Sequence, residues 1–344
     1  MTNLFSAPAA APWHVPTEQQ HFLLQAALLQ DEAALAAWRA WRLTADLDQL
    51  PPGGFGLLPL LAYNLQHLGI VDPLLDKCQG IYRRTWTQNQ LHLRQLATTI
   101  QALQAKQITP LLQGEVLLAL AYYPGPGLRI VQQAQLVTPA AQATAVRLAL
   151  TEAGWHSQPT SKARVRTLVI GCPQPQHFRQ TGSDLALVWQ QAAPNTYPPL
   201  ADDLWQQAQP LLVTPVATQA MSATDLFLQV CTQGIADFWR GGAVQWLVDA
   251  LLLLRTAAAT LDWARLLELA ERQAFTLRLS AALQGLQQWV AAPIPATTLS
   301  TLTTLPVQPF ERWEQQCYQR SFPLLGKGGI LWAAGQRRRW VREG

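Results

Sequence analysis

Charged side chains are what this 344-residue sequence most lacks. They make up 13% of it, about half the share in an average globular protein, and the formal net charge is only +4 at pH 7. A surface so weakly charged is not built to hold a nucleic-acid backbone, and we expect no specific nucleic-acid partner. Near the C-terminal end a basic cluster predicts a solvated tail, with contact to a membrane surface, RNA or an acidic partner as the alternative; it comprises Arg337, Arg338, Arg339 and Arg342.

Cysteine is scarce too, and its positions show neither the paired spacing of a zinc site nor that of a disulfide framework. The four are Cys78, Cys172, Cys231 and Cys317. A reducing cytoplasm is the expected location. The longest apolar run, 243–254, has about half the residues that a bilayer-crossing helix needs. Because residues 1–16 also lack the basic start and apolar core of a signal peptide, we expect no membrane-spanning segment.

Apolar residues are plentiful, at 49% of the sequence, which is ample for real cores. The patterning divides the chain into five parts. We expect a flexible lead at 1–16, an N-terminal helical region at 17–106, a small α/β core at 107–200, a C-terminal helical domain at 201–295, and an extension with the basic tail at 296–344.

The core is predicted from apolar runs with the pattern of β-strands, which begin after Lys106. A helix is expected between them at 138–154. The expected strands are 108–112, 128–137, 164–170 and 184–190. The predicted fold class is α+β, a small mixed sheet flanked by N-terminal and C-terminal helical regions.

Helical periodicity predicts the helices of both flanks. Ser222 and Asp225 resemble a capping box at the start of one of them, and Asp202-Asp203 predicts a helix that begins at Leu204. The other helices are expected to begin at Thr17 and Asp31, to run through Leu57 to Leu65, and to cover 72–106, 223–236, 241–257, 262–272 and 275–291.

Several motifs, each weak alone, are specific in their order and spacing. They are LLAYNL at 60–65, ITPLLQG at 108–114, LRIVQQAQLV at 128–137, LTEAGW at 150–155, LALVW at 185–189, SATDLFLQVC at 222–231 and VQWLVDALLLL at 244–254. In this combination the chain resembles the uncharacterised bacterial nucleotidyltransferase family often found beside polysaccharide and peptide natural-product genes. The resemblance implies a nucleotidyltransferase-like core.

The resemblance also implies how such a core works. In this superfamily a Gly turn after the first strand opens a helix whose backbone amides face the nucleotide phosphates. The next strand carries Asp-x-Asp, whose two carboxylates project from one face and hold magnesium, and a neighbouring strand adds a third carboxylate. Matched to these motifs, Gln113, Gly114 and Arg129 are the candidates for contact with a nucleotide phosphate.

The sequence departs from this pattern at nearly every position that carries chemistry. Where the family has Asp-x-Asp, this chain has Gln133 and Gln135, and Ala186 aligns with the third acid. The family's Lys-Gly becomes Gln113-Gly114. Magnesium prefers anionic oxygen ligands, so two neutral amides are a poor replacement.

Positions that serve packing persist, which indicates a degenerate family member. Gly114 keeps the turn, Arg129 precedes the strand, and Trp189, Trp246 and Asp249 keep their places. Retained packing beside lost chemistry is typical of a pseudoenzyme.

Two acids offer a weak replacement for the lost metal site. Asp184 lies two residues before the third-acid position, and Glu115 follows the Gly turn. The alternative is that Asp184 is a strand-edge residue and Glu115 caps or solvates the helix start. Arg129 is open in the same way, because it could bind a phosphate bidentately or pair with a carboxylate such as Asp249.

Three hypotheses follow. The first is a pseudoenzyme that binds or scaffolds a protein partner or a small-molecule ligand, with no cofactor expected. The second is an active nucleotidyltransferase with a rearranged metal site, which would use Mg²⁺ and a nucleoside triphosphate. The third is a purely helical interaction protein. Separately, the many tryptophans are expected to pack mostly in the core and between domains, with a partner surface formed by a few of them, such as Trp38 and Trp41, as the alternative.

Overall fold

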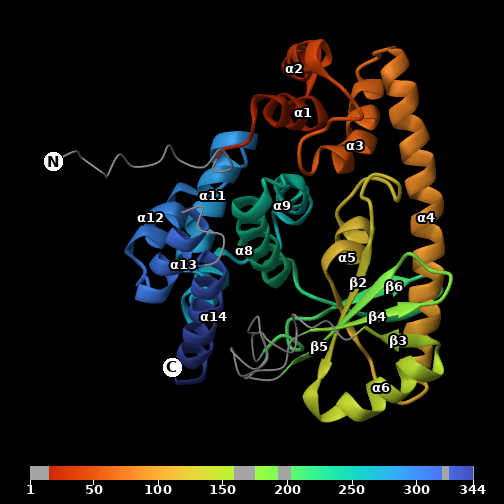
Figure 1. Cartoon of the computed structure of the whole chain (residues 1–344), viewed down its shortest axis with the longest axis vertical. Helices are drawn as coiled ribbons and strands as arrows, with labels where there is room; N and C mark the ends of the chain where they lie inside the picture. Colours follow the sequence, from red (N-terminus) through yellow and green to blue (C-terminus); the bar gives the residue numbers. More distant parts are fainter. Residues whose placement is uncertain (1–14, 159–174, 193–202, 320–324, 344) are drawn as a thin grey trace.

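The structure is a computed structural model that describes residues 15–158, 175–192, 203–319 and 325–343. Helices flank a seven-stranded mixed sheet, so the α+β prediction is confirmed (Figure 1). The hypothesis of a purely helical protein is wrong for the same reason. Across the described ranges, none of the helices combines the length and the apolar character needed to cross a membrane.

The N-terminal helices pack as a layer at one end of the molecule, and the long α4 then runs beside the sheet (Figure 1). A capping box at Thr17 and Gln20 begins the first helix. Trp38 and Trp41 are 5% and 1% exposed and pack against each other, so the idea that they form a partner surface is wrong. The helices are α1 (Glu18–Leu28), α2 (Asp31–Thr44), α3 (Gly54–His67) and α4 (Pro73–Gln104).

The sheet has the strand order β3-β4-β5-β2-β1-β7-β6. Its centre is mixed: β2 pairs with β5 in parallel, with β1 antiparallel to it, and β1 pairs with β7 in parallel. Three helical segments, α5 (Gly114–Ala121), the 3₁₀ turn η2 (Ala140–Gln142) and α6 (Ala143–Glu152), connect strands. The strands are β1 (Leu111–Gln113), β2 (Gln133–Pro139), β3 (Trp155–Ser157), β4 (Gln176–Gln180), β5 (Ala186–Ala192), β6 (Gln209–Val213) and β7 (Val216–Ala220).

The strand predicted at 128–137 begins only at Gln133. Asn89 of α4 explains the difference, because its side-chain nitrogen donates to the carbonyl oxygens of Pro126 and Arg129, at 2.6 and 2.8 Å, and its oxygen accepts from the N–H of Val131. The backbone from Pro126 to Val131 is therefore held by α4, and contact with a neighbouring strand begins only at Gln132, whose carbonyl accepts the N–H of Ala186 on β5 at 3.0 Å.

Four strands were not expected, namely β3 and β4 at one edge of the sheet and β6 and β7 at the other. Residues 209–220, which the pattern placed in the C-terminal helical domain, form β6 and β7 at one edge of the sheet. Pro210 and Pro215 in this stretch favour a loop assignment, since proline is tolerated only at strand edges and turns. The strand predicted at 164–170 lies outside the described residues.

The C-terminal helices end in a folded extension. Ser222 caps α8, where its Oγ accepts the N–H of Asp225 at 3.2 Å. Arg337 is fully buried, so the expectation of a solvated tail is wrong at this residue, whose guanidinium pairs with Glu314 inside the helical packing. The helices are α8 (Ala223–Gly241), α9 (Gln245–Ala257), α10 (Trp263–Arg272), α11 (Thr276–Val290), α12 (Ala296–Thr304), α13 (Pro309–Gln319) and α14 (Leu325–Glu343).

Candidate functional site

The candidate site is one face of the central strands, where the three metal-ligand positions implied by the sequence converge. Gln133 and Ala186 are register partners on the parallel strands β2 and β5. Gln135 lies two residues further along β2 and therefore projects from the same face as Gln133. The structure brings the three positions together, and the groups that meet there are two carboxamides and one methyl.

Gln113 of β1 adds a third amide to this face. It pairs in register with Gln135 and is 2% exposed. Its Nε2 lies 3.5 Å from the Oε1 atoms of Gln135 and Gln190, which are long hydrogen bonds. Its own Oε1 is buried without a hydrogen-bond partner in the described part of the chain. Gln190, two residues beyond Val188 on β5, was missed from the sequence, although strand alternation places it on this face.

Gly114 turns the chain from β1 directly into α5. Its φ of +69° lies in the left-handed region that glycine adopts most easily. A Cβ at Gly114 would lie 2.6 Å from Cδ of Gln135, closer than packed atoms approach. The turn that the family pattern implies is thus present, and the Gln135 carboxamide fills the space against it.

Arg129 forms an internal ion pair and not an open anion site. Its Nε and Nη2 donate to the two carboxylate oxygens of Asp249 on α9, at 2.9 and 3.1 Å. The hydroxyl of Tyr123 donates to the same carboxylate at 2.6 Å and accepts from Nε2 of Gln245 at 3.0 Å. Burial, followed by the Asp249 charge, raises the pKa of Tyr123 well above its ordinary value. Two roles were expected for Arg129, phosphate binding and pairing with a carboxylate such as Asp249, and in the structure it pairs with Asp249.

The two substitute acids have separate partners. Oε2 of Glu115 accepts the backbone N–H groups of Gln132 and Gln133 at 2.7 and 3.0 Å, which fixes the start of β2. Asp184 accepts from Nε2 of Gln88 on α4 at 3.1 Å. Among the described residues, no three His, Cys, Asp or Glu side chains gather to hold a metal ion.

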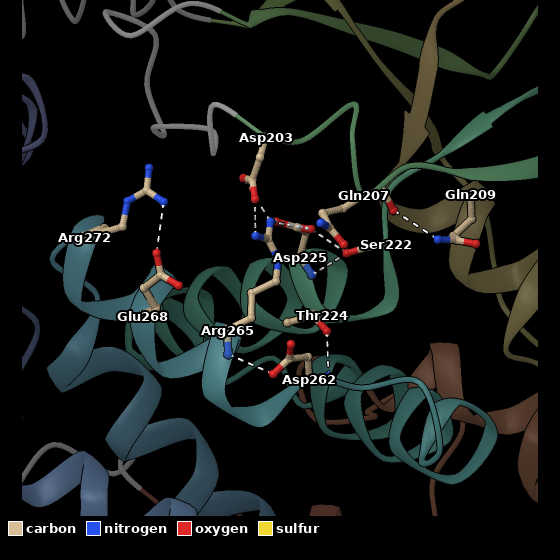
Figure 2. A network of polar contacts seen from close by, with 10 residues as sticks. All are labelled: Asp203, Gln207, Gln209, Ser222, Thr224, Asp225, Asp262, Arg265, Glu268 and Arg272. Atoms are coloured by element: carbon tan, nitrogen blue, oxygen red, sulfur yellow. Dashed lines mark hydrogen bonds and ion pairs between the residues drawn. The ribbon is translucent and has the colours of Figure 1, made fainter.

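A denser polar network lies where the chain approaches β6. Arg265 of α10 binds the carboxylates of Asp203 and Asp225, and the Asp225 carboxylate contacts Ser222 at the start of α8 (Figure 2). The hydrogen bond from Arg265 lowers the pKa of Asp203, whereas burial raises the pKa of Asp225. The helix predicted to begin at Leu204 is replaced by turns, since the Asp203 side chain binds Arg265 and does not cap a helix. The network connects α8 and α10 with the turns that precede β6.

A magnesium-bound nucleoside triphosphate does not fit the residues at this face. Magnesium favours anionic oxygens, and the aligned positions offer neutral groups. Gln113 stands where the family carries a lysine, and the guanidinium of Arg129 is already bound to Asp249. The face keeps the Gly turn into α5 and carries neutral side chains at the three aligned positions.

The mixed sheet, the Gly turn into α5 and the three converging positions define an α+β domain of nucleotidyltransferase type. The chain belongs to the family of uncharacterised nucleotidyltransferases, whose model matches residues 55–291. The match covers the sheet and the helices from α3 to α11 and leaves α12–α14 outside it. No curated protein matches the sequence.

Proposed function

We propose that this chain is a degenerate member of its bacterial family, a cytoplasmic pseudoenzyme that binds or scaffolds a protein partner or a small-molecule ligand. The observation that carries the proposal is the register of Gln133, Gln135 and Ala186. In the register of β2 and β5 these three side chains share a face, and none of them can carry the negative charge that holds magnesium.

Two further observations support the loss of transfer chemistry. The carboxamide of Gln135 packs against Gly114, in space beside the turn that would receive phosphates. Glu115, in the first turn of α5, places a negative charge at the helix end that attracts anions in other proteins. Both features oppose binding of a triphosphate.

Isothermal titration calorimetry with Mg²⁺ and each of ATP, GTP, CTP and UTP tests the proposal. We expect no saturable heat from the wild-type chain. The triple variant Gln133→Asp, Gln135→Asp, Ala186→Asp should gain saturable Mg²⁺ binding, because it restores three carboxylates to one face. A matched control places the same new charges on exposed residues, through Gln206→Asp, Gln207→Asp and Ala217→Asp.

The second candidate, an active enzyme with a rearranged metal site, makes the opposite prediction. It requires magnesium-dependent nucleotide binding by the wild-type chain, abolished by Glu115→Gln or Asp184→Asn. That result would overturn the pseudoenzyme proposal. Gain of Mg²⁺ binding by the control variant would show that added charge alone explains the triple variant.

A further inference from the structure

The outer side of α13 and α14 carries an unusual concentration of exposed tryptophan. Trp313, Trp332 and Trp340 are 40%, 48% and 38% exposed. Only one other tryptophan in the described part of the chain, Trp86 on α4, is comparably exposed. Large aromatic side chains are normally buried in the core or at interfaces, so three on two neighbouring helices indicate an interaction surface.

These side chains form one surface. The ring of Trp313 meets that of Trp332 edge-on, with centroids 4.9 Å apart. Trp313 also packs over Gly329 of α14, where any Cβ would collide with its ring, so glycine permits this close helix contact. Arg339 and Trp340 follow Trp332 by two helical turns and thus lie on the same side of α14.

The charges of this surface have one sign. Both carboxylates of α13, Glu311 and Glu314, point inward and are 2% and 1% exposed. The exposed ionisable side chains described on the two helices are Arg312 and Arg339. We call the surface made by Trp313, Trp332, Trp340, Arg312 and Arg339 the Trp–Arg face.

We propose that the Trp–Arg face docks on an anionic membrane surface. Tryptophan is favoured at the depth of lipid headgroups, where its ring is apolar and its N–H can still reach polar groups. Arginines beside it attract anionic lipids, and no exposed carboxylate described on these helices opposes that attraction. The indoles are half-exposed along the helices, which suits shallow insertion.

The proposal is independent of the amide face, by which we mean the face of the sheet that carries Gln113, Gln133 and Gln135. The Trp–Arg face lies on helices outside the family match, at the C-terminal end of the chain and away from the sheet (Figure 1). Docking here would hold the family domain at the membrane without a spanning segment.

Cosedimentation of the full chain with large unilamellar vesicles tests this inference. We expect binding to phosphatidylcholine vesicles that contain about 30% phosphatidylglycerol, little binding to pure phosphatidylcholine, and weakening by salt. Arg312→Gln with Arg339→Gln should lower the partition coefficient about thirtyfold. Trp332→Ser with Trp340→Ser should lower it on the order of tenfold.

The matched control removes the same side-chain types from α4, through Trp86→Ser and Arg83→Gln, both exposed in the structure. This control should bind like the wild type. Circular dichroism checks that each variant stays folded. We expect all of them to fold, because the changed residues are exposed. A wild-type chain that stays in the supernatant with anionic vesicles, or a control that loses as much binding as the face variants, would overturn the proposal.

Discussion

The amide face of the sheet carries neutral side chains, whereas the helical parts of the molecule contain buried ion pairs. On the sheet, Gln113, Gln133 and Gln135 stand where the family pattern places ions. In the helical parts, Glu314 lies between Arg278 and Arg337, all at most 7% exposed, and Asp249 binds Arg129. Although only 13% of the residues are charged, several of these residues form buried ion pairs between helices or between a helix and a loop.

The difference separates two reasons for keeping an ion. A buried ion pair is costly to break, because removal of one partner leaves an uncompensated charge. A catalytic carboxylate is retained only while its chemistry is needed. The helices keep charged pairs that are costly to break, whereas under the proposed function the sheet no longer carries the charges that transfer would need.

Loss of the Glu314 carboxylate should have the largest effect. Arg278 and Arg337 contact the two carboxylate oxygens of Glu314 at 2.5 and 2.8 Å, and Glu314→Gln removes the negative charge and replaces one of these oxygens by an NH₂ group. We expect the free energy of unfolding to fall by about 3–5 kcal/mol, measured by urea denaturation. Glu268→Gln is the control, because its exposed pair with Arg272 should change stability by less than about 1 kcal/mol. Equal effects of the two variants would break the comparison.

The same carboxylate gives a pH dependence. Burial raises the pKa of Glu314, but the charges of Arg278 and Arg337 outweigh it and lower the pKa from 4.5 to about 2. Because the folded pKa is below the unfolded one, the stabilisation is complete above pH 4.5 and is lost as the pH falls toward 2. The stability difference between the wild type and Glu314→Gln should shrink over this window. A difference that stays constant would contradict the assignment.

Asp249→Asn should come next, at about 3 kcal/mol. It replaces the carboxylate that Arg129 binds through both oxygens with a neutral amide, so within the described part of the chain the guanidinium keeps only Glu115, at 4.0 Å, as an anionic partner. Adding Arg129→Met should recover part of the loss, since the buried and poorly compensated charge is then gone. If the losses of unfolding free energy caused by Asp249→Asn and Arg129→Met simply add in the double variant, the two residues are not coupled.

The sequence was sufficient for most helices from α1 to α11 and for the turn at Gly114, because helical periodicity and turn chemistry are local. It did not predict α12, α13 or α14. That Gln133, Gln135 and Ala186 share a face was an expectation from the family resemblance, and it depends on the pairing of β2 with β5. The sequence was insufficient where a residue distant in the chain determines the limits of an element or the burial of a side chain. Asn89 shortens β2 from outside the sheet, and Arg265 takes Asp203 away from a helix start. Arg337 looks like part of an exposed cluster until Glu314 is placed beside it. Which side chain meets which is set by packing, and single-sequence patterns do not contain it.

Gly114→Ala should cost about 1–2 kcal/mol from its positive φ, together with the clash against Gln135. The variant tests whether the Gln135 side chain of the amide face packs against the turn at Gly114. In a Gln135→Ser background the clash is removed and only the φ cost should remain. Thermal and urea unfolding of the four proteins in this double-mutant cycle measure the coupling. Because the clashing atoms end a flexible side chain, the coupling should be small, and no coupling would mean that the Gln135 carboxamide moves away from the turn without cost.

Gln113→Met should have the smallest effect, within about 1 kcal/mol and toward greater stability. The buried amide of Gln113 makes two hydrogen bonds of 3.5 Å, and its oxygen has no hydrogen-bond partner in the described ranges, so a thioether of similar size loses little. Thr138→Val is the contrast from the opposite face of β2, where Oγ1 accepts from Nε1 of Trp189 at 2.9 Å. Because that buried donor is then left unpaired, the threonine variant should lose about 1–3 kcal/mol. A larger loss for Gln113→Met than for Thr138→Val would mean that the amide face is a stabilising network and not the remnant of a site.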